Sequence, residues 1–450
     1  MIEKIRIAGA RFASQYGMLA VLALLCVYFS WATYHEESPT GQAGAELLAA
    51  RIAGEASKGA SIVVAAPADM EGADFAKRLS DSLQHSGYTV TTVQGDPPSV
   101  RAQLEALAGN GPPPALIATT RDAREWPLWD ALKQSSPAYA RAKIVAPGSV
   151  RRSTFLTPSN LRNIADQTAV IAIIAVGMTM VIITGGIDLS VGSLLALSAV
   201  LTAWLIQLAG GDKASGIAMF GSCIAAVALC GVVGGFSGWL TARFRVPPFI
   251  VTLAGMQIAS GFAFIVARGQ SLYAIPGSFT WLGRGAALFA LPNAVLLMLL
   301  IYAAAHIFMT RTTFGRTIYA VGGNMEASRL SGVRVGRTLI LVYVVSAAMA
   351  GIGGVITASQ LKAGAPIYGV MYEMYVIAAV VVGGTSLTGG QGRIFGTLIG
   401  AFVIAVIRNG MNLMDVEPYT QKVLLGIVIL GAVLIDIARQ RRAGRPHSTL

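Results

Sequence analysis

A single carboxylate stands inside an apolar stretch, in the run ITGGIDLSVGS from Ile183 to Ser193. An ionised Asp at the centre of a bilayer costs about 2.5–3.5 kcal/mol on insertion scales, so Asp188 requires a partner or a water-filled cavity. Gly185 and Gly186 would let a helix break here, so that the freed backbone can line a passage. The run predicts a transport path, and a plain membrane bundle is the alternative.

A second glycine run echoes the first. Residues 185–192 and 383–390 share the pattern GGxxL[S/T]xG, and each run follows a Val/Ile-rich stretch and leads into a helix of small residues. Matching interrupted segments in the two halves of a transporter point to its central site. Small residues that merely let helices pack closely are the alternative. The residues expected to line or gate a path are Gly185, Gly186, Asp188, Ser190, Gly383, Gly384, Thr385 and Ser386.

Asp188 has two further interpretations. It can act as the N-cap of a helix that starts near Leu189, at the boundary between membrane and cytosol. This structural role and a contact with the transported solute can coexist. The same carboxylate would be the proton or sodium site if the protein were an ion-coupled secondary transporter.

The segment Thr310–Thr338 is long for a connection between two membrane helices. Asn324 is placed to cap a helix of one or two turns over Met325–Ser331, which Gly332 would end. Such a helix, carrying Leu330 and flanked by arginines, is suited to dock a soluble partner. A solvated basic loop is the alternative.

The composition is that of a membrane protein. Of the 450 residues, 54% are hydrophobic and 12% are charged, whereas about 25% are charged in soluble domains. The net charge of +12 does not indicate nucleic-acid binding, because Lys and Arg cluster in short segments beside apolar runs. This placement follows the positive-inside rule and marks the cytoplasmic side. We therefore expect an all-α polytopic protein that sits in a lipid bilayer and has no nucleic-acid partner.

Ten apolar runs are long enough, or nearly so, to cross a hydrocarbon core of about 30 Å, which predicts about ten transmembrane helices. They are Tyr16–Thr33, Thr168–Thr184, Leu189–Leu208, Gly216–Leu240, Phe249–Ala267, Ala287–Met309, Leu339–Ala358, Val370–Gly383, Ile394–Arg408 and Val423–Ile437. The eighth is short, as in a broken or re-entrant helix. With the basic N-terminus inside, ten crossings leave both termini in the cytoplasm. A cleaved signal peptide is the alternative to a retained first helix.

Residues 35–160 differ from the rest, because proline and charge rise and short β-like runs alternate with helical patterns. This alternation predicts a small parallel sheet with helices on both faces, as an inserted extracytoplasmic α/β domain. The expected strands are 61–65, 88–93, 115–119 and 143–146, and the expected helices are 72–85, 99–108 and 123–134. The expected domains are 1–34 with the first span, 35–160, 161–437 with nine spans, and the basic cytoplasmic tail 438–450.

No catalytic motif stands out in the sequence. The phosphate loop G-x-x-x-x-G-K-[S/T] is absent, so the chain does not hydrolyse ATP by that route, and no nucleophile–base pair is evident. The histidines are scattered and the cysteines lie in apolar runs, so we expect no metal site. If transport is active, its energy comes from a partner or from an ion gradient.

Several runs together resemble one family. ITGGIDLSVGS, RVPPFIVTLAGMQIASGFAFIV, FGRTIYAVGGNMEASRLSGV and VVVGGTSLTGGQGRIFGTLIGAFVIAVIRNGMNLMDV resemble the membrane permeases of bacterial ABC importers for ribose, galactose, xylose and related sugars. The resemblance covers about 155–437. It implies a non-enzymatic permease of the bacterial inner membrane that translocates a sugar or similar small polar solute and has no cofactor of its own.

The resemblance also implies partners. These are cytoplasmic ATPase subunits that carry ATP and Mg²⁺, a second permease copy or a paralogue, and a periplasmic solute-binding protein. By the same resemblance, the residues of the ATPase-coupling loop are Gly322, Gly323, Asn324, Glu326, Arg329, Leu330 and Gly332.

The chain departs from the family pattern at two places. Met325 stands where an acidic residue is frequent, and the domain at 35–160 replaces a short loop. The strand–helix order of this domain is similar to one lobe of a periplasmic sugar-binding protein. We expect it to dock a separate binding protein or to sense its state. A membrane receptor with an outer sensing domain is the remaining alternative.

Overall fold

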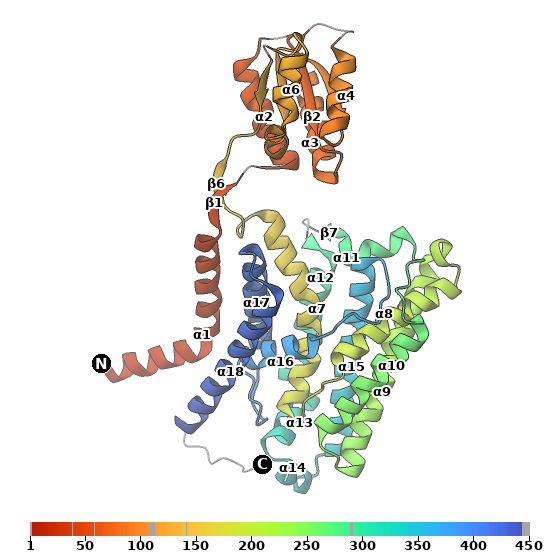
Figure 1. Ribbon diagram of the computed structural model, residues 1–450. Helices are drawn as coiled ribbons and strands as arrows, with labels where there is room; N and C mark the ends of the chain where they lie inside the picture. The colour runs from red at the N-terminus through yellow and green to blue at the C-terminus, as the bar shows by residue number, and fades with distance from the viewer. Residues whose placement is uncertain are drawn as a thin grey trace. The chain divides into compact units, whose positions relative to one another are not determined.

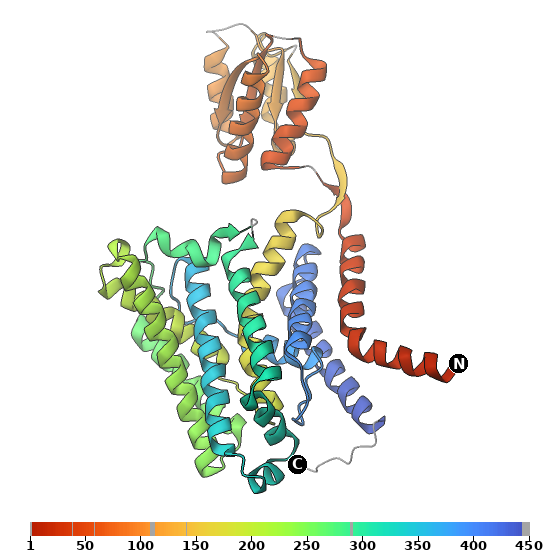
Figure 2. The same ribbon diagram turned by 180° about the vertical axis from the view of Figure 1, so that it is seen from behind.

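The computed structural model describes residues 2–37, 39–57, 59–108, 113–140, 142–288 and 291–442. The chain forms two compact units (Figures 1 and 2). The membrane unit comprises Met1–Thr33 and Thr154–Leu450, and the α/β unit comprises Tyr34–Ser153. Of the expected tail at 438–450, residues 443–450 lie outside the described residues.

The α/β unit is built on a four-stranded parallel sheet, which the strand–helix alternation predicted. Its strand order is β3-β2-β4-β5. In the central strand, Ile62 lies between Val90 and Leu116, and the strand is apolar along its length because both faces are covered. The strands are β2 (Ser61–Ala66), β3 (Thr89–Gln94), β4 (Leu116–Thr119) and β5 (Lys143–Val145).

Helices cover both faces of this sheet (Figure 1). One face carries α2 (Gly41–Glu55) and α3 (Met70–His85), whose apolar residues form a single buried cluster with the sheet. The other face carries α4 (Pro97–Leu107) and α6 (Leu128–Ser135), which form a second cluster. The unit therefore has a hydrophobic core of its own on each side of the sheet.

Three features of the α/β unit differ from the expectation. The single helix expected over 123–134 is two helices, α5 (Arg121–Arg124) and α6, because Pro127 interrupts the run. Helix α2 was not expected from the sequence. The antiparallel pair of β1 (Tyr34–Glu37) and β6 (Val150–Ser153), which joins the two ends of the unit, was not expected either.

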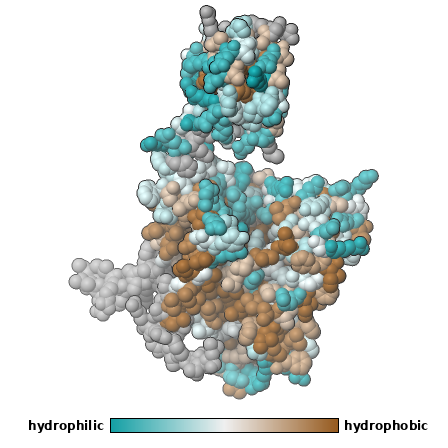
Figure 3. Space-filling view, in the orientation of Figure 1, coloured by the Kyte–Doolittle hydropathy of each residue, from teal (hydrophilic) through white to brown (hydrophobic). Residues whose placement is uncertain are grey.

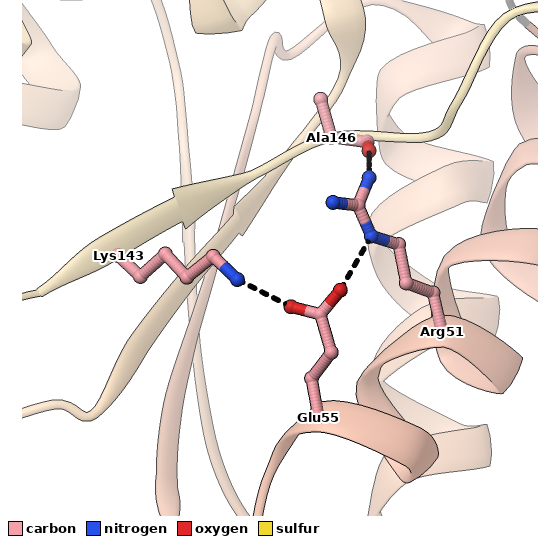
Figure 4. A network of polar contacts seen from close by, with 4 residues as sticks. All are labelled: Arg51, Glu55, Lys143 and Ala146. Atoms are coloured by element: carbon pink, nitrogen blue, oxygen red, sulfur yellow. Dashed lines mark hydrogen bonds and ion pairs between the residues drawn. The ribbon is translucent and has the colours of Figure 1, made fainter.

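Glu55 links the end of α2 to β5 (Figure 4). Its carboxylate accepts hydrogen bonds from Lys143 Nζ at 2.6 Å and from Arg51 Nε at 2.9 Å. Arg51 also donates to the backbone oxygen of Ala146 at 3.4 Å. The hydrogen bond from Lys143, followed by that from Arg51, lowers the pKa of Glu55 from 4.5 to about 2.

We expect the α/β unit to lose stability in acid as this network is protonated. Because the pKa of Glu55 is lowered on folding, its contribution is complete above pH 4.5 and is lost as the pH falls toward about 2. The measurement is urea unfolding of a fragment of residues 34–153 at stepped pH, followed by circular dichroism. As the pH falls, the free energy of unfolding should decrease less steeply for Glu55→Gln than for the native fragment. The control is Glu105→Gln, which removes the exposed ion pair to Arg101. Equal slopes for Glu55→Gln and the native fragment would contradict this role.

In the membrane unit, seven of the described helices are long and apolar enough to cross a membrane, where the sequence predicted about ten spans. They are α7 (Pro158–Ile183), α8 (Val191–Leu208), α9 (Gly216–Phe244), α10 (Pro248–Ala267), α12 (Asn293–Arg311), α15 (Val335–Leu361) and α17 (Ile394–Leu413).

The three other apolar runs are helical but shorter. They are Gly17–Ala32 within α1 (Ile2–Ala32), α16 (Tyr372–Val382), and Pro418–Gly431 within α18 (Pro418–Arg442). The eleven residues of α16 rise about 16 Å, or about half of a hydrocarbon core. The expectation of a short helix at this place is confirmed, and its being broken or re-entrant in the membrane stays a prediction.

The burial of the long helices varies widely in this unit. The apolar window of α7 is 89% buried, whereas that of α9 is 17% buried. α9 packs against α15, where Gly234 and Gly238 admit the backbone of the neighbouring helix. Apolar side chains remain on the outer surface of the unit (Figure 3). This is the arrangement expected when the outer face contacts lipid.

Short elements connect the long helices. The span expected over 287–309 begins only at Asn293, because the hairpin of β7 (Ala286–Leu288) and β8 (Leu291–Pro292) precedes it. Pro292 lacks an N–H and suits the residue just before a helix. The other connecting elements are η1 (Gly211–Lys213), η2 (Gly277–Thr280), α11 (Trp281–Arg284), α13 (Thr313–Gly323) and α14 (Met325–Leu330).

Candidate functional site

The two glycine runs end two helices in the same way. α7 ends at Ile183 and α16 ends at Val382, and two residues later a glycine takes a left-handed conformation, at Gly185 (φ 82°) and Gly384 (φ 89°). The bonds that close the two ends are Gly186 N–H to Val181 O and Thr385 N–H to Val380 O, each 3.1 Å. Both are Schellman-type endings, in which glycine avoids the clash of a Cβ.

The structural match between the two runs differs by one residue from the match of their letters. Gly185 occupies the place of Gly384, and Gly186 that of Thr385. The shared pattern GGxxL[S/T]xG therefore marks two equivalent helix ends, but it aligns them one residue out of register. The left-handed glycine is the first of one pair and the second of the other, so an alignment by letters places both pairs one residue out of register.

Both runs meet the end of α13 at a glycine junction, which we define as Ile183, Gly322, Gly389 and Gly390. Gly390 N–H donates to the Ile183 carbonyl oxygen at 2.8 Å. A Cβ on Gly322 would overlap that oxygen and lie 2.7 Å from Gly390 N. Three backbone segments thus touch with no side chain between them, which connects the end of α13 to both helix-ending runs.

Asp188 is buried, with 1% of its surface exposed. Its Oδ1 accepts from the Ser190 N–H at 3.0 Å and from the Ser190 hydroxyl at 2.6 Å, and its Oδ2 accepts from the Ser346 hydroxyl of α15 at 2.8 Å. The helix starts at Val191 rather than near Leu189, so Ser190 occupies the N-cap position and Asp188 binds its N–H. In this conformation the carboxylate binds protein donors and ties the first run to α15.

The second run is closed by hydrogen bonds of its own. Ser386 N–H donates to Gln391 O at 3.1 Å, and the Ser386 and Thr388 hydroxyls lie 2.9 Å apart. Thr385 is buried, and no partner is found for its hydroxyl among the described residues. These groups shape the loop between α16 and α17.

The expected short helix in the coupling segment is present as α14. The Asn324 side chain accepts from the Ala327 N–H at 2.9 Å, and Gly332 takes a left-handed conformation (φ 82°) just beyond the helix. Glu326 and Arg329 form an exposed ion pair at 3.1 Å. Leu330 is 85% exposed at the end of this helix. Gly323 lies next to the glycine junction, at the end of α13.

The structure brings two residues of each predicted group together at a cavity of about 440 Å³. Gly185 and Gly186 lie on one side, and Glu326 and Arg329 of α14 lie on another. The turn between α9 and α10 completes the wall. Gly383, Gly384 and Asp188 are not among the lining residues. We call this space the α14 cavity.

The acid at the start of α16 was not singled out from the sequence. Glu373 is half-buried in the first turn of α16, and its carboxylate lies where a Cβ on Gly192 would stand. A count of polar residues within apolar runs would have found it at the start of the eighth run. Glu373 lies at the N-terminal end of α16, the half-length helix.

Interrupted helices, a buried polar cluster and a capped helix that presents an exposed leucine define a polytopic membrane permease. Among the described residues, no group of three or more His, Cys, Asp or Glu side chains is placed to hold a metal ion.

Comparison with known proteins agrees. Residues 160–433 match the model of the family described as branched-chain amino acid transport system / permease component. The chain is 40% identical to the ribose import permease of Escherichia coli (strain K12), over 69% of this chain and 95% of that protein. It is 36% identical to the D-allose permease of the same strain (64% and 86%) and 35% identical to its xylose permease (64% and 87%). No solved structure matches.

The chain therefore belongs to this permease family. It is the permease component of an ABC importer and not itself an enzyme, and permeases of this family carry no cofactor. Such permeases work in general with ATPase and binding-protein partners. The α/β unit precedes the matched region.

Proposed function

We propose that this permease imports a sugar or a similar small polar solute into the bacterial cytoplasm, driven by ATPase subunits that bind against α14. The similarity to ribose, allose and xylose permeases supports the substrate class. The glycine junction supports the mechanism, since it joins the segment that carries α14 to both interrupted helices through backbone contacts. It is the single observation on which the proposed coupling depends.

The coupling follows from the connectivity. A shift of α14 moves Gly323 and Gly322, because they are adjacent along the chain. Gly322 bears directly on Ile183 at the end of α7 and lies beside Gly390 in the loop between α16 and α17, so a shift of Gly322 would displace both segments. A closely packed junction passes on such a displacement as a switch between two packings. Closure of the ATPases would thus select one packing of the spans and their release the other.

The exposed leucine of α14 provides the test. In membranes that hold the permease with its ATPase and binding protein, Leu330→Asp should lower sugar uptake and stimulated ATP hydrolysis by about tenfold or more, because burying one leucine contributes about 1.5–3 kcal/mol. Leu330→Met, which keeps an apolar contact, should retain both. Glu326→Gln or Arg329→Gln should uncouple hydrolysis from uptake in a folded chain. Full uptake by Leu330→Asp would reject α14 as the ATPase contact.

Two other functions are less well supported. An ion-coupled transporter needs a carboxylate that the ion can reach, whereas Asp188 is buried and already accepts three hydrogen bonds. Uptake that collapses with an ionophore and persists without an ATPase would favour that class. A receptor needs a cytoplasmic signalling module, whereas the long segment between α12 and α15 holds, among the described residues, only the short helices α13 and α14.

The proposed assembly contains a second permease copy or a paralogue. Both termini face the cytoplasm, and the α/β unit faces the periplasm of the bacterial inner membrane. There the α/β unit docks the solute-binding protein or senses its state. Accessibility of single cysteines placed in α14 and in the α/β unit to an impermeant thiol reagent tests this orientation, and labelling of α14 from outside would refute it.

A further inference from the structure

The α14 cavity contains a buried hydroxyl that the proposed coupling does not use. Tyr343 of α15 is 1% exposed, and no hydrogen-bond partner is found for its hydroxyl among the described residues. Tyr343 is one of the residues that line the cavity. A buried hydroxyl without a partner costs about 1–3 kcal/mol. Because this hydroxyl is enclosed, a ligand in the cavity would have to displace the packing beside it, and a hydrogen bond formed there would remove this cost.

Charge at the cavity indicates what such a ligand is. Arg245 and Arg329 both line it, with Glu326 as the lining acid. Glu326 pairs with Arg329 at 3.1 Å, and no ion pair of Arg245 is found in the described part of the chain. The lining therefore carries one excess positive charge, on an exposed guanidinium that can bind phosphate through two N–H groups.

The remaining walls add shape and polarity. The hydroxyls of Thr184 and Thr241 donate to backbone oxygens of their own helices and can still accept a hydrogen bond, and Pro247, Pro248 and Leu339 supply apolar lining. A volume of about 440 Å³ is within the range of small-molecule sites. A phosphate group beside Arg245, joined to a small hydroxylated body that reaches Tyr343, matches this set of groups.

We propose that the α14 cavity binds a phosphate ester of a small polyhydroxyl molecule and that its occupancy restrains transport. A bound ester would bridge the α9–α10 turn to α14, because both line the cavity. It would thereby resist the shift of α14 that the glycine junction passes on. The binding step does not depend on the proposed function, whereas the restraint of transport does.

Two kinds of molecule carry such a phosphate ester, namely a soluble sugar phosphate and the headgroup of a phosphoglycerol lipid. The purified full chain is placed in nanodiscs of phosphatidylcholine alone or with phosphatidylglycerol. Its melting temperature is then measured with ribose 5-phosphate, ribose or inorganic phosphate. A rise with ribose 5-phosphate in phosphatidylcholine identifies the soluble ester. A rise caused by phosphatidylglycerol, which also prevents the response to ribose 5-phosphate, identifies the lipid.

Three variants make the assignment specific. Arg245→Gln should weaken binding of the effective ester by about tenfold or more, the size of one charge-assisted hydrogen bond. Arg243→Gln is the control, because that neighbouring arginine contacts the Phe244 ring and does not line the cavity. Tyr343→Phe should leave the ligand-free protein as stable as the native chain or more so, and still weaken binding.

A transport assay then separates binding of the ester from its restraint of transport. In the reconstituted importer with its ATPase and binding protein, the ester should slow uptake by the native chain, and Arg245→Gln should transport at the native rate without slowing. No melting shift with either ester, or an equal shift in Arg245→Gln, would overturn the site. A shift with no effect on uptake in an active importer would overturn the restraint alone. Failure of the native importer to transport any sugar would count against the proposed function instead.

Discussion

Gly322→Ala should abolish coupled uptake, and Gly323→Ala, one residue further on, should leave it nearly intact. A Cβ at Gly322 would overlap the Ile183 carbonyl oxygen and crowd Gly390 N. A Cβ at Gly323 would meet no atom within 4 Å. The two variants add the same methyl group to the same helix end, so helix propensity and hydrophobicity are matched between them.

The expected loss of uptake in Gly322→Ala follows from the atoms that the added methyl group displaces. Overpacking in a core costs about 1–3 kcal/mol when side chains can move. Here the obstructing atoms belong to backbone, and the Gly390 N–H to Ile183 O hydrogen bond must open as well. We expect uptake to fall by about a hundredfold, equivalent to about 2.7 kcal/mol.

The measurement is uptake in membranes with matched amounts of permease, together with binding-protein-stimulated ATP hydrolysis. If the junction passes motion from α14 to the spans, Gly322→Ala should still bind the ATPase while uptake is lost. A variant that no longer accumulates in the membrane would indicate a purely structural junction. Normal uptake by Gly322→Ala would reject the junction altogether.

Asp188→Ala should strongly destabilise the membrane unit, whereas Asp188→Asn should be tolerated. Alanine leaves the hydroxyls of Ser190 and Ser346 and one N–H without their acceptor in a buried place. Groups left unsatisfied in this way cost about 1–3 kcal/mol each, so a loss of about 3 kcal/mol or more is expected. Asparagine keeps one acceptor oxygen for Ser190, and its amide can donate to the Ser346 hydroxyl.

This pair of variants separates a structural role from an ion-binding role. Melting of the purified chain in detergent should drop for Asp188→Ala and remain near native for Asp188→Asn, and uptake should follow stability. An ion-coupling carboxylate would behave differently, because asparagine removes its charge as completely as alanine does. Folded but inactive Asp188→Asn would therefore restore Asp188 as a transport site.

Much of the architecture was determined by the sequence. Apolar runs of sufficient length predicted the membrane helices, and alternating strand and helix patterns predicted the parallel sheet of the α/β unit. Asn324 and Gly332 predicted the bounds of α14 to within a residue at its C-terminal end. These signals are local, because a cap, a period or an apolar stretch acts on neighbouring residues of the chain.

Other features depended on contacts between distant segments, which local patterns do not encode. The sequence paired the glycine runs but missed their register, since the left-handed position depends on where each helix ends. The path role of Asp188 stays a prediction, but no local pattern could show that Ser346, 158 residues away, donates a hydrogen bond to its carboxylate. No periodic pattern in the sequence predicts that Ile183, Gly322 and Gly390 lie in contact. Only the tertiary structure brings these backbones together, because close approach requires glycine but glycine alone does not specify its neighbour.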